Sequence, residues 1–264
     1  MKISILTPTY NRINTLENLY NSLLTNSKYN TELEWLIMDD GSTDNTKDLV
    51  ENWIKDNEIE IKYFRQENQG KMTALNNLVP KSEGNIIIEC DSDDYFTEDA
   101  FKIIAEKVEA LEKNKELYAL MFLKYDQDKN IIGNEFNENN HISKNFDLYF
   151  KGKLIGDKAI IFNSTIRKQY KHRLEKSEKF VTEARMYHEM DLKYNVICFN
   201  EPIMICEYRN DGYTQNIQKI FNKNPNGYYK YFKEMFSFSM KGVTLRKRLH
   251  IIKNLIVFYI KTKF

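Results

Sequence analysis

Short apolar runs alternate with longer amphipathic stretches from residue 3 to about residue 123. Such alternation is typical of βαβ units, and it predicts an α/β fold with a mostly parallel sheet flanked by helices. We expect strands over residues 3–7, 33–39, 60–65, 85–90 and 117–124. We expect helices over residues 14–24, 44–55, 70–78 and 98–111.

The rhythm weakens after residue 126. Residues 130–145 are rich in Asn, Glu and Lys, which predicts a turn with a mobile loop. Beyond it we expect strands over 158–162, 196–199 and 203–208, a helix over 183–193, and helical structure from about 224 to the end. No repeat or low-complexity linker separates the two parts, so we expect them to pack together.

Composition narrows the class of protein. The 264 residues can form one large domain or a domain with an appended subdomain. With 39 basic and 38 acidic side chains the net charge is +1, so no global field indicates nucleic acid. The three cysteines lie in or beside apolar runs, which favours a reducing cytosol. The first apolar run is too short to be the core of a signal peptide. The apolar run over residues 255–260 is too short to span a membrane, so we expect a cytoplasmic or peripheral membrane protein.

The end of the chain is basic and apolar. From Lys241 onward it has no Asp or Glu, and Leu245, Leu249, Ile252, Leu255, Ile256 and Tyr259 recur at helical spacing between Lys and Arg residues. This pattern fits an amphipathic helix on an anionic lipid surface. A basic helix that closes the fold, or a dimer contact, fits it equally well.

Two expected strands end in clusters of carboxylates. Asp39 and Asp40 follow one, and Asp91, Asp93 and Asp94 follow the other. Ligands of open α/β sheets bind where several strands present their carboxyl ends, so we expect both clusters in one crevice. Carboxylates spaced two apart on an extended segment point to the same side, so one can bind a ribose hydroxyl while the other binds Mg²⁺ or Mn²⁺. A surface turn is the ordinary alternative.

Two further loops lie at the same expected edge of the sheet. Residues 7–12 can hold a base or ribose, or form an ordinary strand-to-helix turn. Asp39 can accept the N3 proton of uracil, or belong to an acid cluster that caps the next helix. The run from Asn68 to Lys71 joins a glycine, a helix start and a cation, which suits a diphosphate; a solvated lysine is the alternative.

The motifs T-P-T-Y-N-R, D-D-G-S-T-D, N-x-G-K-x-x-A-x-N and D-S-D-D, in this order and spacing, resemble family 2 glycosyltransferases of the GT-A fold. The resemblance implies a Rossmann-like sheet, with Thr9 and Asp39 at the base, Lys71 near the diphosphate and Asp91 at the ribose or sugar. It implies Asp93 as a ligand of Mn²⁺ or Mg²⁺, with Asp91 and Asp94 as further candidates. The full set expected at the donor is Thr7, Pro8, Thr9, Tyr10, Asn11, Arg12, Asp39, Asn68, Gly70, Lys71, Asp91 and Ser92.

The resemblance also implies a general base in the second half. Inverting members of the family use a carboxylate at the start of a second-half helix, often in an E-D pair. This chain has Glu183 followed by Ala184, so we expect Glu183 to be the base. Asp157, Glu189 and Asp191 are the rival candidates. Tyr208, Tyr213, Tyr228 and Tyr229 are candidates for stacking on acceptor sugars, although core packing is an equally ordinary role.

The resemblance therefore implies a metal-dependent, inverting glycosyltransferase that moves a sugar from a UDP-sugar to a growing surface polysaccharide or a lipid-linked acceptor. We expect a donor-binding half over residues 1–125, an acceptor-binding half over 126–223 and a helical tail over 224–264. Two alternatives stay open. A sugar nucleotidyltransferase should carry a glycine-rich first loop, which residues 7–12 lack, whereas a nucleotide-sugar-binding subunit without catalysis would lack only the base.

Overall fold

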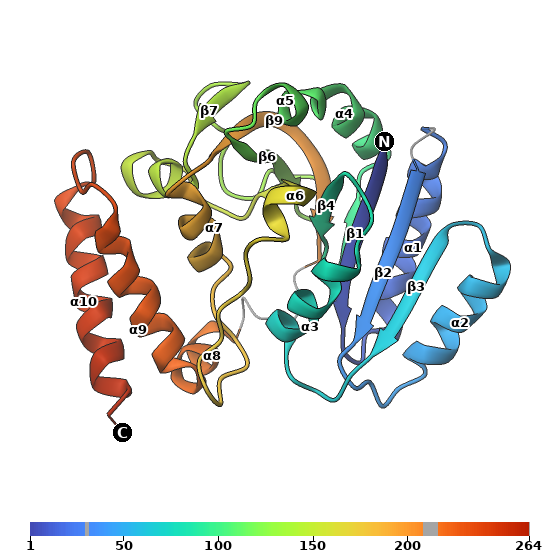
Figure 1. Ribbon diagram of the computed structural model, residues 1–264, viewed down its shortest axis with the longest axis horizontal. Helices are drawn as coiled ribbons and strands as arrows, with labels where there is room; N and C mark the ends of the chain where they lie inside the picture. The colour runs from blue at the N-terminus through green and yellow to red at the C-terminus, as the bar shows by residue number, and fades with distance from the viewer. Residues whose placement is uncertain (30–31, 208–215, 264) are drawn as a thin grey trace.

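The computed structural model describes residues 1–29, 32–207 and 216–263. These residues contribute nine strands to one sheet in the order β3-β2-β1-β4-β8-β6-β9-β5, with β7 paired to β9. The strands are β1 (Lys2–Thr9), β2 (Glu32–Asp39), β3 (Glu60–Arg65), β4 (Ile86–Glu89), β5 (Asp94–Phe96), β6 (Leu117–Tyr125), β7 (His141–Ser143), β8 (Ala159–Asn163) and β9 (Asn195–Cys206). Strands from both predicted halves of the chain thus share one sheet (Figure 1).

Strand direction divides the sheet into two parts. The strands β3, β2, β1 and β4 are parallel, as the sequence predicts for the first half. In the other part of the sheet β8 runs antiparallel to both β4 and β6, and β5 and β7 run antiparallel to β9. This part is therefore mixed, and the sequence did not predict it because a buried apolar run gives no information on strand direction.

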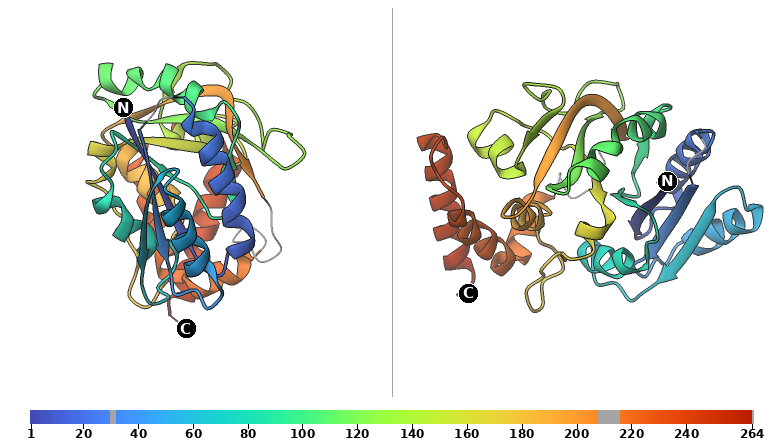
Figure 2. Two further views of the ribbon diagram at one scale, coloured as in Figure 1. Left: turned by 90° about the vertical axis from the view of Figure 1, so that its right-hand side faces the viewer. Right: turned by 45° about the horizontal axis from the view of Figure 1, so that its top comes forward.

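Helices cover both faces of the sheet (Figures 1 and 2). The α-helices are α1 (Ile13–Ser27), α2 (Thr46–Asp56), α3 (Lys71–Leu78), α4 (Ala100–Lys107), α5 (Glu109–Lys113), α6 (Ser164–Arg167), α7 (Ala184–Asp191), α8 (Ile217–Lys223), α9 (Pro225–Glu234) and α10 (Leu245–Lys261). Shorter turns are η1 (Val79–Lys81), the single π-helical turn η2 (Asp147–Lys151) and η3 (Met235–Ser237). Helix α10 packs on α9 along one outer edge of the molecule.

Alternating side chains of the strands enter two apolar cores. Ile86 and Ile88 of β4 pack with residues of α1, α2 and α4 on one face, whereas Ile87 packs with residues of α3, α7 and α9 on the other. Side chains alternate across a strand, so β4 contributes to both cores. Both faces are buried, which fits the continuous apolar runs in the sequence.

Strand β9 differs from the two strands predicted over 196–199 and 203–208. It runs unbroken through Pro202, which lies opposite Leu123 at a register irregularity between β6 and β9. A proline lacks the N–H that a regular ladder requires, and the irregularity accommodates it without ending the strand. Residue 208 lies outside the described residues. The helix expected over 98–111 forms two helices, α4 and α5, on either side of Val108.

A buried ion pair holds the carboxyl end of β4 beside α6. The Nε of Arg167 donates to Oε1 of Glu89 at 2.6 Å, and its Nη1 donates to the carbonyl oxygen of Tyr170 at 2.7 Å. Burial alone would raise the pKa of Glu89, but Arg167 and His172 lower it to about 2. Glu89 lies two residues before Asp91, so the ion pair supports the segment that carries the acid cluster.

Arg167→Met tests this support. Removal of the guanidinium leaves the buried Glu89 carboxylate with only His172 beside it, at 3.5 Å, so we expect the free energy of unfolding to fall by about 3–5 kcal/mol in urea titrations. Arg173→Met is the matched control, because Arg173 is exposed and also pairs with a glutamate. An exposed pair contributes at most about 1 kcal/mol, and equal losses in both variants would contradict the prediction.

The pH dependence separates a charge effect from lost packing. The pKa of Glu89 lies below its unfolded value of 4.5, so its contribution to stability is present above that pH and is lost as the pH falls toward about 2. In Arg167→Met the buried carboxyl group has lost its guanidinium partner and is stabilised by protonation instead. We therefore expect the difference between variant and wild type to narrow as the pH is lowered from neutral through 4.5, whereas a packing defect would leave it constant.

Candidate active site

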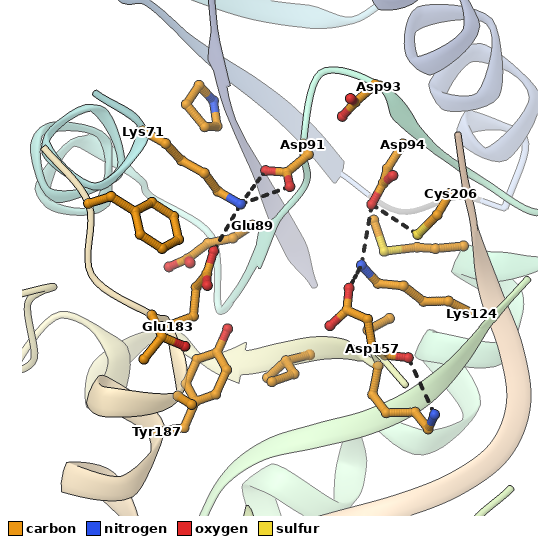
Figure 3. Close-up of a pocket in the computed structure, with 18 of the residues that line it drawn as sticks. Lys71, Glu89, Asp91, Asp93, Asp94, Lys124, Asp157, Glu183, Tyr187 and Cys206 are labelled. Carbon is orange, nitrogen blue, oxygen red and sulfur yellow. Dashed lines mark hydrogen bonds and ion pairs between the residues drawn. The ribbon is translucent and has the colours of Figure 1, made fainter. Parts of the chain in front are cut away.

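A cleft of about 1030 Å³ opens at the carboxyl ends of β1 and β4. The amino-terminal ends of β8 and α7 and part of α9 form its other side, and Figure 3 shows its charged residues. The structure brings together most of the residues singled out from the sequence. Those lining the cleft are Pro8, Thr9, Tyr10, Arg12, Asn68, Gly70, Lys71, Asp91, Ser92, Asp93, Asp94, Asp157 and Glu183.

Two residues of the first loop support the cleft without lining it. The buried Thr7 hydroxyl accepts a hydrogen bond from Nε1 of Trp35 at 2.9 Å. Asn11 has a left-handed backbone, and its side-chain oxygen accepts from the amide of Thr43 at 2.8 Å. Both residues therefore fix the loops around the cleft.

Asp40, rather than Asp39, faces the cleft at the end of β2. The buried Asp39 carboxylate accepts hydrogen bonds from the Ser42 amide and from the hydroxyl of Tyr63. Asp40 lines the cleft, and its carboxylate accepts from the backbone amides of Gln69 and Gly70, each at 2.8 Å. Neighbouring side chains on an extended segment point to opposite sides, so only one of the two acids can face the cleft.

Lys71 is shared between the two sides of the cleft. Its Nζ lies 2.7 Å from Oδ1 of Asp91 and 3.0 Å from Oε1 of Glu183, as the dashed lines in Figure 3 mark. Burial disfavours the charge on Lys71, but the two carboxylates outweigh it and raise its pKa above the ordinary value. One ammonium group thus links the end of β4 to the start of α7.

A second buried lysine makes a similar link and was not singled out from the sequence. The Nζ of Lys124 lies 2.7 Å from Oδ2 of Asp157 and 3.3 Å from Oδ2 of Asp94. The thiol of Cys206 donates to the same Asp94 oxygen at 3.2 Å. The feature of the sequence that could have identified Lys124 is its position at the carboxyl end of the buried apolar run that forms β6. It holds the Asp157 carboxylate in an ion pair within the cleft.

The other rivals for the base lie away from the cleft lining. Glu189 pairs with Arg173 at the surface of α7. Asp191 is buried and accepts from the backbone amides of Asn145 at 3.0 Å and Phe146 at 2.7 Å, while burial raises its pKa to about 7. Of the acids considered for the base, Glu183 and Asp157 are therefore the two that face the cleft.

Asp93 offers oxygen ligands beside the other acids. Burial and the charges of Asp91 and Asp94 raise its pKa to about 6, against the opposing influence of Arg12. A hard divalent cation would offset this repulsion, and carboxylate oxygens are its preferred ligands. Asp94 is buried and turned toward Lys124 and Cys206, whereas Asp91 pairs with Lys71 but is more exposed (Figure 3). Asp93 is therefore the first candidate ligand of a cation and Asp91 the second.

Aromatic residues line the second side of the cleft: Tyr149, Phe150, Phe180, Tyr187, His188, Tyr228 and Tyr231. Burial among these rings lowers the pKa of His188 to about 3, so the imidazole is neutral near pH 7. Tyr229 packs against Tyr259 at the α9–α10 contact instead. Tyr208 and Tyr213 lie outside the described residues. This side is less charged than the side that carries the acid cluster.

The backbone segments that carry the two sides of the cleft cross closely at Gly70. Its φ of +93° is left-handed, and a Cβ there would lie 2.5 Å from the carbonyl oxygen of Lys179. The side chain of Lys179 donates back to Asn68. The absence of a side chain at residue 70 lets the segment leading to Glu183 pass close to the loop before α3.

Residues 4–175 match the model of the family described as glycosyl transferase family 2. An uncharacterized glycosyltransferase of Rickettsia conorii is 36% identical over 118 residues, which are 45% of this chain and 18% of that protein. The poly(ribitol-phosphate) beta-N-acetylglucosaminyltransferase TarS of Staphylococcus aureus is 31% identical over 102 residues, which are 39% and 18% of the two chains. The chain thus spans only a minor part of the length of these relatives.

Solved structures match over nearly the whole chain. The structure of TarS 1–349 in complex with UDP-GlcNAc has a TM-score of 0.64 at 18% identity and covers 98% of this chain and 80% of that one. A mannosyltransferase of Pyrobaculum calidifontis in complex with GDP-Man and Mn²⁺ has a TM-score of 0.62 at 14% identity, covering 98% and 73%. The predicted GT-A fold class is confirmed by these likenesses.

Gly70→Ala tests the close crossing, with Gly242→Ala as the matched control. Both glycines have left-handed backbones, but a Cβ at Gly242 would meet only the Lys151 side chain, at 3.7 Å. Backbone strain of about 1–2 kcal/mol is common to both variants. The clash with Lys179 should make Gly70→Ala measurably less stable than the control in urea unfolding, and equal stabilities would show that the crossing readily relaxes.

Proposed function

The chain belongs to glycosyl transferase family 2, and we propose that it transfers a sugar from a nucleoside diphosphate sugar to an acceptor hydroxyl with inversion. The observation that carries the proposal is the convergence of Asp91, Lys71 and Glu183 in one cleft. We propose a UDP-sugar as donor, Mn²⁺ or Mg²⁺ as cofactor, and a surface glycan or lipid-linked sugar as acceptor.

The base of the nucleotide fits between the loops after β1 and β2. The Thr9 hydroxyl is buried at the cleft with no hydrogen-bond partner among the described residues. The Asp40 carboxylate accepts three described hydrogen bonds, from Gln66, Gln69 and Gly70, and a carboxylate has room for about four. Asp40 can therefore accept the N3 proton of uracil in the role expected of Asp39. The TarS complex with UDP-GlcNAc supports this choice of nucleotide.

The diphosphate fits beside Lys71, whose charge is held at the cleft by two carboxylates. Asp93 and Asp91 would hold the divalent cation. When bound, such a cation neutralises charge on the diphosphate and stabilises it as a leaving group. The mannosyltransferase complex with GDP-Man and Mn²⁺ supports a metal-dependent reaction.

Glu183 is our choice of general base. It lies at the start of α7, between Lys71 and the aromatic side of the cleft. Its carboxylate accepts the proton of the acceptor hydroxyl as the acceptor oxygen bonds to the anomeric carbon. The bond from that carbon to the diphosphate oxygen breaks, and its electron pair leaves with the nucleoside diphosphate. A single displacement of this kind inverts the anomeric configuration.

Thermal-shift measurements test the donor site. UDP with Mn²⁺ should raise the unfolding midpoint more than GDP, CDP or ADP with Mn²⁺, because ligand binding to the folded state stabilises it by mass action. Asp93→Asn should abolish most of the increment that Mn²⁺ adds, whereas Asp128→Asn, an exposed control, should retain it. A Mn²⁺ increment that persists in Asp93→Asn would remove this residue from the metal site.

Glu183→Gln tests catalysis, with Glu189→Gln on the same helix as its control. Loss of a general base lowers rates by about 10²–10⁴-fold. We expect that loss in UDP release from a UDP-sugar with acceptor, while UDP binding stays within about threefold of wild type. Full activity in Glu183→Gln together with a loss in Asp157→Asn would transfer the role to Asp157. Donor binding by the wild type with no transfer would favour a non-catalytic binding subunit.

A further inference from the structure

Helix α10 has two apolar faces, and only one of them is covered. Phe258 stacks on Phe232 and Tyr228 of α9, and Ile251 is buried on the same side. Five large apolar side chains on the opposite face are 43–71% exposed; this outer stripe consists of Leu245, Leu249, Ile252, Ile256 and Ile260, and Tyr259 at its edge packs on Tyr229 of α9. At 100° per residue the stripe covers about 80° of the helix circumference.

The region around the stripe is strongly cationic. Residues 241–263 contain seven Lys or Arg and no Asp or Glu. Two of these residues form hydrogen bonds within the protein: Lys247 donates to the carbonyl oxygen of Tyr149, and Arg248 donates to that of Val243. Arg246 and Lys253 are exposed beside the stripe, and neither pairs with a carboxylate in the part of the chain that the structure describes.

We propose that the outer stripe of α10 docks on the surface of an anionic lipid bilayer. The apolar side chains enter the boundary between headgroups and acyl chains, and Arg246 and Lys253 contact lipid phosphates. A second copy of this chain is a poorer occupant, because pairing two stripes would bring two cationic flanks together. No helix among the described residues is long and apolar enough to cross a membrane.

Docking orients the cleft relative to the lipid. Tyr228 lines the cleft and stacks on Phe258 at a ring distance of 5.2 Å, so one aromatic layer separates the cleft from α10. Helices α7 and α9, which carry part of the aromatic side of the cleft, lie on the side of the molecule nearest α10 (Figure 1). Delivery of a lipid-linked acceptor to that side follows if the proposed transfer is correct, whereas the docking itself does not depend on it.

Vesicle co-sedimentation of the full chain tests the proposal without any catalytic readout. We expect binding to vesicles of phosphatidylcholine with about one third phosphatidylglycerol, and at least tenfold weaker binding to phosphatidylcholine alone. High salt should weaken binding to the anionic vesicles, since it screens the charges. Equal binding to both vesicle types, or to neither, would overturn the proposal.

Paired variants assign the surface. Two double variants should each lower vesicle binding at least tenfold: Leu249→Ser/Ile256→Ser and Arg246→Glu/Lys253→Glu. All four side chains are exposed, so circular dichroism should show an unchanged fold. Ile54→Ser/Leu192→Ser and Lys102→Glu/Lys115→Glu make the same chemical changes at exposed sites elsewhere and should bind as wild type. Wild-type binding by both α10 variants would overturn the assignment. So would a dimer in solution that Leu249→Ser/Ile256→Ser dissociates, since a second copy would then cover the stripe.

Discussion

Burial of negative charge at the carboxyl end of the sheet is the constraint on which the structure depends. Carboxylates from separate strand ends meet in a partly enclosed cleft, where each would be unstable without a counter-charge. Arg167 forms an ion pair with Glu89. Lys71 pairs with Asp91 and Glu183, and Lys124 pairs with Asp94 and Asp157. Each cation also joins two elements distant in sequence. The same interactions that offset the burial of charge therefore hold the second half of the chain against the first.

This arrangement leaves the cleft with two chemically different sides. The acid cluster and Lys71 concentrate charge at the ends of β1 and β4, while rings from α7 and α9 form the opposite side. A charged diphosphate and a divalent cation suit the first side, and the flat faces of sugar rings suit the second. Glu183 lies between them, where the proposed base would take the proton of an acceptor hydroxyl. The proposed donor and acceptor sites therefore lie on opposite sides of the cleft.

The sequence predicted the first half well because its signals are local. Strand β3 has the predicted bounds, and the acid clusters fall at strand ends as expected. The sequence could not decide whether Asp39 or Asp40 faces the cleft. Successive side chains of a strand point to opposite sides, so an error of one residue in the end of the strand exchanges the two. It also missed Lys124, whose partners come from distant segments. Strand β9 was divided in two because a register irregularity that tolerates Pro202 depends on its neighbour β6.

The crossing at Gly70 bears on how such proteins diverge. The close approach there involves the backbone carbonyl oxygen of Lys179, so this contact requires glycine at residue 70 but does not depend on which side chain residue 179 carries. Substitutions that reshape the acceptor side can accumulate while this backbone contact persists. Structural similarity extends over 98% of the chain, whereas the matched sequence of the relatives covers less than half of it. A contact made by backbone atoms is one that such a change of sequence can leave in place.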